Sequence, residues 1–274
     1  MRHNVPPRSV AELNQWLTDL AVESGHPEKG RALRKNLATA IIAQMLPKDA
    51  YLKGGSAISL RYSLAESRLS RDVDSVFRGA KEHFLDEFLR NLREGWHGFT
   101  GEISEEQRKH LPEGIHFFTA FVALYYKNGR FAKVTFEASP ESSAGEVSTE
   151  RILDEGMQEL FSSIGFPVGM ATMLGIDEQL AEKLDGVTNP DYPRGRDLRD
   201  IEVILSHHTP NLDALRAHIH NLEGRESAHL IRMVPNRSKE RYRIGYREAG
   251  GTTFEHAWSL ALRLIEQVDG SRVS

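Results

Sequence analysis

One short helix between two strand candidates constrains the fold more than any other part of the sequence. The three segments are residues 50–53, 56–62 and 72–77. The first strand runs directly into Gly54-Gly55, where the pattern changes to helical spacing. The second strand alternates in polarity, with Val73 on one face and two aspartates on the other. This unit predicts a sheet that is combined with helices.

The rest of the chain supplies further helices and a hairpin. Apolar spacings of three and four predict helices at 10–23, 31–46, 81–93, 177–187, 194–206, 211–222 and 253–268. Ser9 is the N-cap candidate for the first of them. Two β-rich runs, residues 115–126 and 130–138, are joined through Asn128-Gly129, which is a strong hairpin signal. The order of these elements predicts an α+β fold with a mostly helical C-terminal part.

Length and composition exclude several classes of protein. The chain has 274 residues, enough for one large domain or two modest ones, and a polar linker candidate divides it into domains at 1–140 and 150–274. Because there is no cysteine, disulfide frameworks, thiolate zinc sites, iron–sulfur clusters and thiol nucleophiles are excluded. The apolar runs fall short of the ~20 residues of a membrane span, and the start lacks a secretory signal. We expect a cytoplasmic protein without a membrane partner.

Basic residues gather in two segments of a chain whose net charge is −4. Between positions 28 and 71, nine Lys or Arg residues stand against three acids, and between 225 and 247 seven stand against two. Tyr242 and Tyr246 are interleaved in the second segment and are candidates for stacking on unpaired bases. The two segments indicate contact with a polyanion such as RNA. The alternative is that both are solvated basic faces.

Asp72 and Asp74 are the first candidates for a catalytic role. Side chains at i and i+2 of a strand share a face, with Cα atoms about 6.5 Å apart, so both carboxylates can bind the same hard cations. Upstream, Gly54, Gly55 and Ser56 place backbone N–H groups, a helix N-terminus and a hydroxyl at one point, as phosphate sites do. Each motif alone is weak, because solvated aspartates and glycine turns are common. Together they predict a phosphate site beside a metal-binding acid pair.

A third carboxylate is required if the chemistry is metal-assisted phosphoryl or nucleotidyl transfer. Two cations need further ligands, and the attacking hydroxyl needs a base. Glu137 supplies this carboxylate from the second hairpin strand, on the face that Lys133 and Thr135 share, while Val134 and Phe136 take the other face. Without the other motifs, a solvated edge residue would be the better interpretation of Glu137.

Four motifs in order resemble the AbiEii/AbiGii-type nucleotidyltransferase toxins of the polymerase-β-like superfamily, and look closest to the MenT branch. They are Lys53-Gly-Gly-Ser-Ala-Ile-Ser-Leu-Arg-Tyr62 with Arg68-Leu-Ser-Arg-Asp-Val-Asp74, the strand Phe131 to Glu137, Leu180-Ala-Glu-Lys183-Leu, and Arg194-Gly-Arg-Asp197-Leu-Arg-Asp200. The resemblance covers roughly residues 50–205. It implies a nucleotidyltransferase core with a small mixed sheet, flanked by helices, and a C-terminal domain that completes the active site.

Lys183 and Asp200 also have a physical interpretation of their own. Lys183 projects from a face beside the apolar face of its helix, so its ammonium can reach a triphosphate as a mobile point charge. Asp197 and Asp200 lie on one side of the next helix; either can orient Lys183, and the resemblance favours Asp200. The alternative is a routine surface ion pair between helices. Arg71 and Arg196 are further candidates for phosphate contacts.

The resemblance implies the toxin of a toxin–antitoxin system, a Mg²⁺-dependent enzyme that transfers NMP from an NTP to the 3′ end of tRNA and releases pyrophosphate. Mn²⁺ is an alternative ion, and a cognate antitoxin is the expected protein partner. The assigned residues are Asp72, Asp74 and Glu137 for the metal, Gly54, Gly55, Ser56, Arg71 and Lys183 for the nucleotide, and Lys183 and Asp200 to complete the catalytic set. Two other functions stay open: the same chemistry on a small-molecule or protein hydroxyl, and an inactive module that binds nucleotide or antitoxin.

Overall fold

The structure is a computed structural model, and it divides the chain into two compact units. It describes residues 5–66, 68–107, 118–141, 147–192, 194–224, 229–231 and 239–269. The first unit comprises residues 1–142 and 149–174, and the second comprises 143–148 and 175–274. The first unit therefore includes residues 150–174, which were predicted from the sequence to belong to the C-terminal domain.

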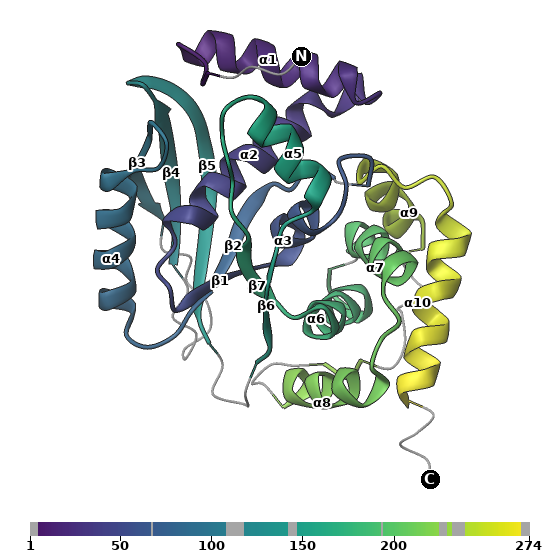
Figure 1. The fold of residues 1–274 in the computed structure, drawn as a ribbon. Helices are drawn as coiled ribbons and strands as arrows, with labels where there is room; N and C mark the ends of the chain where they lie inside the picture. The colour runs from purple at the N-terminus through teal and green to yellow at the C-terminus, as the bar shows by residue number, and fades with distance from the viewer. Residues whose placement is uncertain are drawn as a thin grey trace. The chain divides into compact units, whose positions relative to one another are not determined.

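The first unit is built on one mixed sheet (Figure 1). Its strands are β1 (Ala50–Lys53), β2 (Asp72–Phe77), β3 (Phe99–Gln107), β4 (Phe118–Tyr126), β5 (Gly129–Pro140), β6 (Thr149–Ile152) and β7 (Ala171–Leu174). Across the described ranges their order is β3-β4-β5-β2-β1-β7-β6. β2 is parallel to β5 and antiparallel to β1, and β1 is parallel to β7. The acidic strand β2 thus occupies the middle of the sheet.

Five α-helices of the first unit accompany this sheet in the described ranges. They are α1 (Val10–Glu23), α2 (Gly30–Met45), α3 (Gly54–Arg61), α4 (Lys81–Glu94) and α5 (Glu155–Ser163). Ser9 caps α1 by accepting a hydrogen bond from Glu12 N, as predicted. Figure 1 shows α4 alongside β3, and the two elements are in contact. Residues of α1, α2, α4 and α5 form one apolar core with the sheet.

The core fixes which face of β2 and β5 carries the polar residues. Val73 on β2 and Phe136 on β5 are register partners, and both are fully buried. The Phe136 ring packs against Phe88, with centroids 4.8 Å apart, and Phe84 lies beyond it. Because side chains alternate along a strand, the neighbours of Val73 and Phe136 project to the opposite face.

The second unit is helical in its described residues. Its helices are α6 (Ile176–Thr188), α7 (Gly195–His207), α8 (Leu212–Glu223), α9 (Lys239–Glu248) and α10 (Phe254–Asp269). Each contributes fully or nearly fully buried side chains to the interior, among them Leu180, Leu184, Ile201, Leu215, Tyr242, Tyr246 and Ala261. The predicted mostly helical C-terminal part is confirmed for this unit.

The α+β fold class is confirmed, and several elements were not foreseen. The predicted helices and the strands at 50–53 and 72–77 are present, and the Asn-Gly hairpin joins β4 to β5 through Lys127 and Asn128, whose φ angles are 46° and 67°. Residues 115–117 of the first hairpin run and 142–146 of the predicted linker lie outside the described residues. The elements β3, β6, α5, β7 and α9 were not predicted from the sequence.

The missed elements share weak sequence signals. β6 and β7 have four residues each, too few to establish an alternating pattern, and the sequence of β3 is rich in polar residues. Buried Arg61 connects this region to α3, since its guanidinium pairs with Glu150 on β6 at 2.5 Å and donates to the Leu174 carbonyl at 2.9 Å.

None of the helices that the structure describes has the length and apolar character of a membrane span.

Replacing Phe136 by alanine tests whether the aromatic packing behind β5 stabilises the first unit. We expect Phe136→Ala to lower the free energy of unfolding by about 3–5 kcal/mol, because the ring is fully buried against Phe88 and its loss leaves a cavity. Urea unfolding of the full chain measures this. Arg130→Ala, at an exposed position of the same strand, is the control and should change it by less than about 0.5 kcal/mol. Equal losses in the two variants would contradict the assignment.

Candidate active site

The acidic residues of the first unit are brought together by the pairing of β2 with β5. Asp74 is the register partner of Glu137, and Asp72 is the partner of Thr135. In a parallel pair, partners point to the same face, so Asp72, Asp74 and Glu137 all project opposite the buried Val73 and Phe136. On the other side of β2, Lys53 at the end of β1 is the partner of Asp74. Three of the residues predicted for catalysis therefore share one patch of the sheet.

The glycine turn at the start of α3 lies against Asp74. Gly54 has a φ of 65°, in the left-handed region that favours glycine. A Cβ at this position would lie 3.1 Å from Asp74 Cγ and closer still to the carboxylate. Ser56 is fully buried, and its hydroxyl donates to the Lys53 carbonyl at 3.1 Å and accepts from Asp74 N at 3.3 Å. In this structure, the hydroxyl predicted to bind phosphate ties the turn to β2.

Arg68 is a residue that the sequence analysis did not assign to the site. A Cβ on Gly55 would lie 2.9 Å from Arg68 Cζ, so the guanidinium rests directly on this glycine. Arg71, which was predicted as a nucleotide contact, is exposed just before β2. No periodicity connects Arg68 to Gly55, because the segment between them is partly loop, and only the three-dimensional structure brings them together.

Lys35 is a second cation that sequence reasoning missed. From α2, its ammonium donates to the Arg71 carbonyl at 3.0 Å, beside the start of β2. Burial lowers the pKa of Lys35, while the carboxylates of Asp72 and Asp74 oppose this by favouring the charged form. The two aspartates therefore lie in the electrostatic field of a lysine fixed on a neighbouring helix.

The carboxylates suit a hard metal ion chemically but do not surround one point. Carboxylate oxygens are the donors that Mg²⁺ and Mn²⁺ prefer. Among the residues described, however, no group of three or more His, Cys, Asp or Glu side chains is arranged to hold a metal ion. A metal site formed by Asp72, Asp74 and Glu137 stays a prediction.

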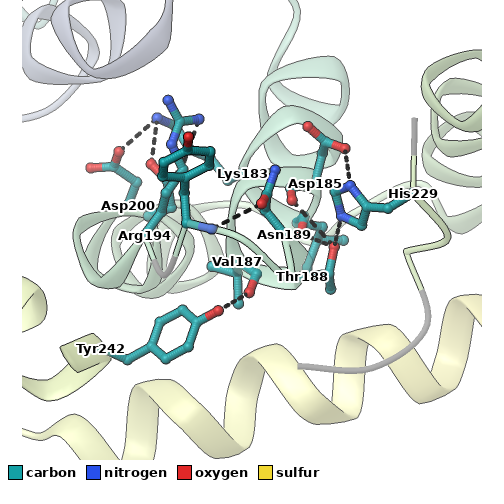
Figure 2. A network of polar contacts seen from close by, with 12 residues as sticks. Lys183, Asp185, Val187, Thr188, Asn189, Arg194, Asp200, His229 and Tyr242 are labelled. Atoms are coloured by element: carbon teal, nitrogen blue, oxygen red, sulfur yellow. Dashed lines mark hydrogen bonds and ion pairs between the residues drawn. The ribbon is translucent and has the colours of Figure 1, made fainter. Parts of the chain in front are cut away.

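The second unit holds Lys183 between two aspartates. Its ammonium lies 3.1 Å from Asp197 Oδ1 and 2.9 Å from Asp200 Oδ2, and all three side chains are less than a tenth exposed. Arg194 adds a cation 3.7 Å from the other oxygen of Asp197. Figure 2 shows the Lys183 region of this network. The ion pair between helices, which was the alternative interpretation, is therefore present, but it is buried between α6 and α7 and does not lie at the surface. A role of Lys183 toward a triphosphate stays a prediction.

The second basic segment does not present its tyrosines for base stacking. Tyr242 and Tyr246 are fully buried; Tyr242 donates to the Val187 carbonyl at 2.6 Å, as Figure 2 shows, and Tyr246 donates to Glu202 at 2.8 Å. The stacking prediction is wrong, because the two residues lie one helical turn apart on the inner face of α9.

Several cations of the basic segments are also engaged within the protein. Lys239 and Arg243 pair with Glu255 at 2.9 Å and 2.7 Å. Arg196, the other candidate phosphate contact, lies 3.4 Å from Glu248. The remaining cations of the second segment include Arg225, Arg232 and Arg237, which lie outside the described residues. Contact of these segments with a polyanion stays a prediction.

The chain is similar in sequence to one protein family and in structure to solved proteins. The model of the family described as nucleotidyl transferase AbiEii toxin, Type IV TA system, matches residues 35–255. Among solved structures, MenT4, a nucleotidyltransferase toxin from Mycobacterium tuberculosis H37Rv, is 14% identical with a TM-score of 0.51, over 94% of this chain and 98% of that one. JHP933 from Helicobacter pylori is also 14% identical, with a TM-score of 0.48, over 86% and 90% of the two chains. No curated protein sequence matches the chain.

Removing the buried ammonium tests the Lys183 network. We expect Lys183→Met to lower the free energy of unfolding by about 3–5 kcal/mol, because it leaves two buried aspartates without their cation. Adding Asp197→Asn and Asp200→Asn to this variant should recover part of the loss, since no buried charge is then uncompensated. Thermal unfolding of the full chain measures both effects. A single variant as stable as the wild type would contradict the buried pairing.

The burial of Tyr242 predicts a pH dependence. Burial, aided by the charge of Asp197, raises the pKa of Tyr242 to about 12. The neutral phenol therefore contributes stability that is complete below the unfolded pKa of about 10 and is lost as pH rises toward 12. Between pH 9.5 and 12, the free energy of unfolding should fall by up to about 2–3 kcal/mol more in the wild type than in Tyr242→Phe. Tyr192→Phe, at an exposed tyrosine, should show the same pH dependence as the wild type. If the free energy of unfolding falls equally with pH in all three proteins, Tyr242 is not the group responsible.

Proposed function

The chain belongs to the AbiEii family of nucleotidyltransferase toxins of toxin–antitoxin systems, and on this premise we propose that it transfers NMP from an NTP to the 3′ end of a tRNA. The family model covers residues 35–255 and with them every residue assigned to the site. The protein is therefore a nucleotidyltransferase toxin, with a nucleotide as one substrate. The acceptor, the metal ion and the roles of individual residues are the proposed part.

The observation that carries the proposal is the register of Asp74 with Glu137 beside the Gly54-Gly55 turn. In nucleotidyl transfer, the acceptor hydroxyl oxygen forms a bond to the α-phosphorus, the bond from that phosphorus to the oxygen bridging the β-phosphate breaks, and pyrophosphate leaves. The hydroxyl proton needs an acceptor. We assign this role to the Glu137 carboxylate, and the turn with its backbone N–H groups to the triphosphate.

We propose Mg²⁺ as the cofactor, with Mn²⁺ as the alternative, held by Asp72, Asp74 and Glu137. The support is the donor chemistry of three carboxylates on one face of the sheet. When bound, the ion would supply charge neutralisation for the phosphate oxygens. Strand pairing fixes the backbone positions from which Asp72 and Asp74 would reach the ion.

Lys183 and Asp200, in the second unit, are proposed to act on the phosphates of the NTP. Asp200 and Asp197 hold the ammonium in one orientation, so its charge is fixed before a substrate binds. Charge that is positioned in advance requires no reorganisation during the reaction, which is the main source of electrostatic stabilisation in active sites. Lys183 is accordingly a candidate catalytic residue, and the two aspartates are positioning residues.

RNA is favoured as the acceptor class by the resemblance to the MenT branch and by exposed cations that remain in both basic segments. Arg31, Arg241 and Arg247 are exposed. A hydroxyl on a small molecule or on a protein would be served by the same chemistry at Asp74 and Glu137. The expected protein partner is an antitoxin, as for other toxins of toxin–antitoxin systems.

Labelling of RNA tests the proposal. The protein is incubated with total RNA, Mg²⁺ and each labelled NTP in turn, and the labelled pool is identified on a gel. We expect one NTP to label the tRNA pool at its 3′ end and chelation of the metal to abolish labelling. Asp74→Asn should lower the rate at least ~100-fold with an unchanged melting temperature, because it removes a charge from the site but no core contact. Asp86→Asn, at an exposed aspartate on α4, is the matched control.

Other outcomes would assign other functions. Label in a small molecule or a protein, and not in RNA, would overturn the tRNA acceptor and retain the chemistry. Labelling by Asp74→Asn within a few-fold of the wild type would overturn the role of the carboxylate. An absence of label with every NTP and every acceptor pool would indicate a module that binds nucleotide or antitoxin without catalysis.

A further inference from the structure

Gly55 has no side chain at a position where the backbone would accept one. Gly54, its neighbour, has a φ of 65° and needs to be glycine for that reason alone. The φ angle of Gly55 is not in the left-handed region, and this residue lies in the first turn of α3. Alanine is the better helix former by about 1 kcal/mol. The reason for glycine here must therefore be sought in the space around it.

That space is filled by Arg68. A Cβ on Gly55 would lie 2.9 Å from Cζ and 3.1 Å from Nη1 of this side chain, and closer still to its other terminal nitrogen. The three nearest atoms all belong to the guanidinium. Glycine at position 55 allows the planar cation to rest on the backbone of the turn, which a methyl group would prevent.

The arrangement places opposite charges over two successive residues. The carboxylate of Asp74 lies over Gly54, and the guanidinium of Arg68 lies over Gly55. Arg68 is half-buried, whereas Arg71 is exposed. Of these two arginines, Arg68 is the one whose charged group lies against the turn that faces the catalytic carboxylates.

We propose that Arg68 binds the β- and γ-phosphates of the NTP, and that Gly55 makes room for its guanidinium. This inference rests on the proposed nucleotidyl transfer and names the residue that receives the leaving pyrophosphate. A guanidinium presents several N–H donors in a plane that matches two phosphate oxygens at once. Its charge lies beside the metal-binding carboxylate, where the negative charge of the leaving pyrophosphate increases as its bond to the α-phosphorus breaks.

Binding of inorganic pyrophosphate to the full chain is the first test, because this probe needs no knowledge of the preferred base or acceptor. By calorimetry in Mg²⁺, we expect Arg68→Ala to weaken pyrophosphate binding at least ~10-fold, as expected for loss of a charge-assisted hydrogen bond. Arg68→Lys should recover only part of the affinity, because an ammonium cannot bind two oxygens in one plane. Arg90→Ala, at an exposed arginine of α4, is the control and should bind as the wild type does.

The second test asks whether Gly55 acts through Arg68. Gly55→Ala should fold normally, because the atoms in its way are the far end of a flexible side chain, and it should weaken pyrophosphate binding ~3–10-fold by displacing the guanidinium. In the Arg68→Ala background, the same substitution should have no further effect, which makes the double-mutant cycle strongly non-additive. Gly30→Ala is the matched control, since its Cβ would meet only Ala21 Cβ at 3.9 Å.

The outcomes separate this inference from the proposed function. If RNA is labelled but Arg68→Ala leaves pyrophosphate binding and the KM for NTP unchanged, Arg68 is not a phosphate ligand and the transfer activity stands. If Arg68→Ala loses pyrophosphate but RNA is never labelled, the phosphate site stands and the proposed transfer to tRNA is wrong. Additive effects of Gly55→Ala and Arg68→Ala would overturn the role of Gly55, and a wild-type chain that binds no pyrophosphate would overturn the whole inference.

Discussion

The parallel pairing of β2 with β5 is the constraint on which the rest of the first unit's site depends. It places Val73 beside Phe136 in the core and Asp74 beside Glu137 on the opposite face. A shift by one residue would exchange the two faces and drive Glu137 into the aromatic cluster of Phe84 and Phe88. The aromatic packing on the buried face of the sheet thus fixes the register of the carboxylates on the opposite face. The same six paired residues of β2 determine both the packing and the position of the carboxylates.

Much of this arrangement could be predicted from the sequence because it follows from local patterns. Alternation assigned Asp72, Asp74 and Glu137 to polar faces, and Asn128-Gly129 predicted the hairpin that carries Glu137. What local patterns do not contain is the choice of partner strand, since parallel strands are never joined by a tight turn. The family resemblance grouped Glu137 with Asp72 and Asp74, but the pairing of β2 with β5 comes from the structure. The contact between Arg68 and Gly55 had no such support, because it joins a loop to a helix without any repeating spacing.

In the second unit, the composition of a basic segment gave a wrong prediction of which tyrosines are exposed, and the spacing of those tyrosines indicates the correct one. Tyr242 and Tyr246 stand among basic residues, which favoured a nucleic-acid surface, yet their spacing of four is that of one helix face. In the structure that face is the core of the unit, where the Tyr242 ring packs edge-on against Trp258. Composition describes what a segment could bind if it were exposed. Periodicity indicates which of its side chains are exposed, and it takes precedence when the two disagree.

The buried group of Lys183, Asp197 and Asp200 needs an explanation beyond stability. Desolvation of three charges opposes burial, and a well-packed apolar group of similar volume is often equally stable or more so. Arg194 beside Asp197 balances the charges at two cations and two anions, which limits that cost without removing it. What an apolar group cannot provide is an ammonium with a fixed direction. That fixed direction is the reason for proposing Lys183, and not only its helix, as part of the triphosphate site.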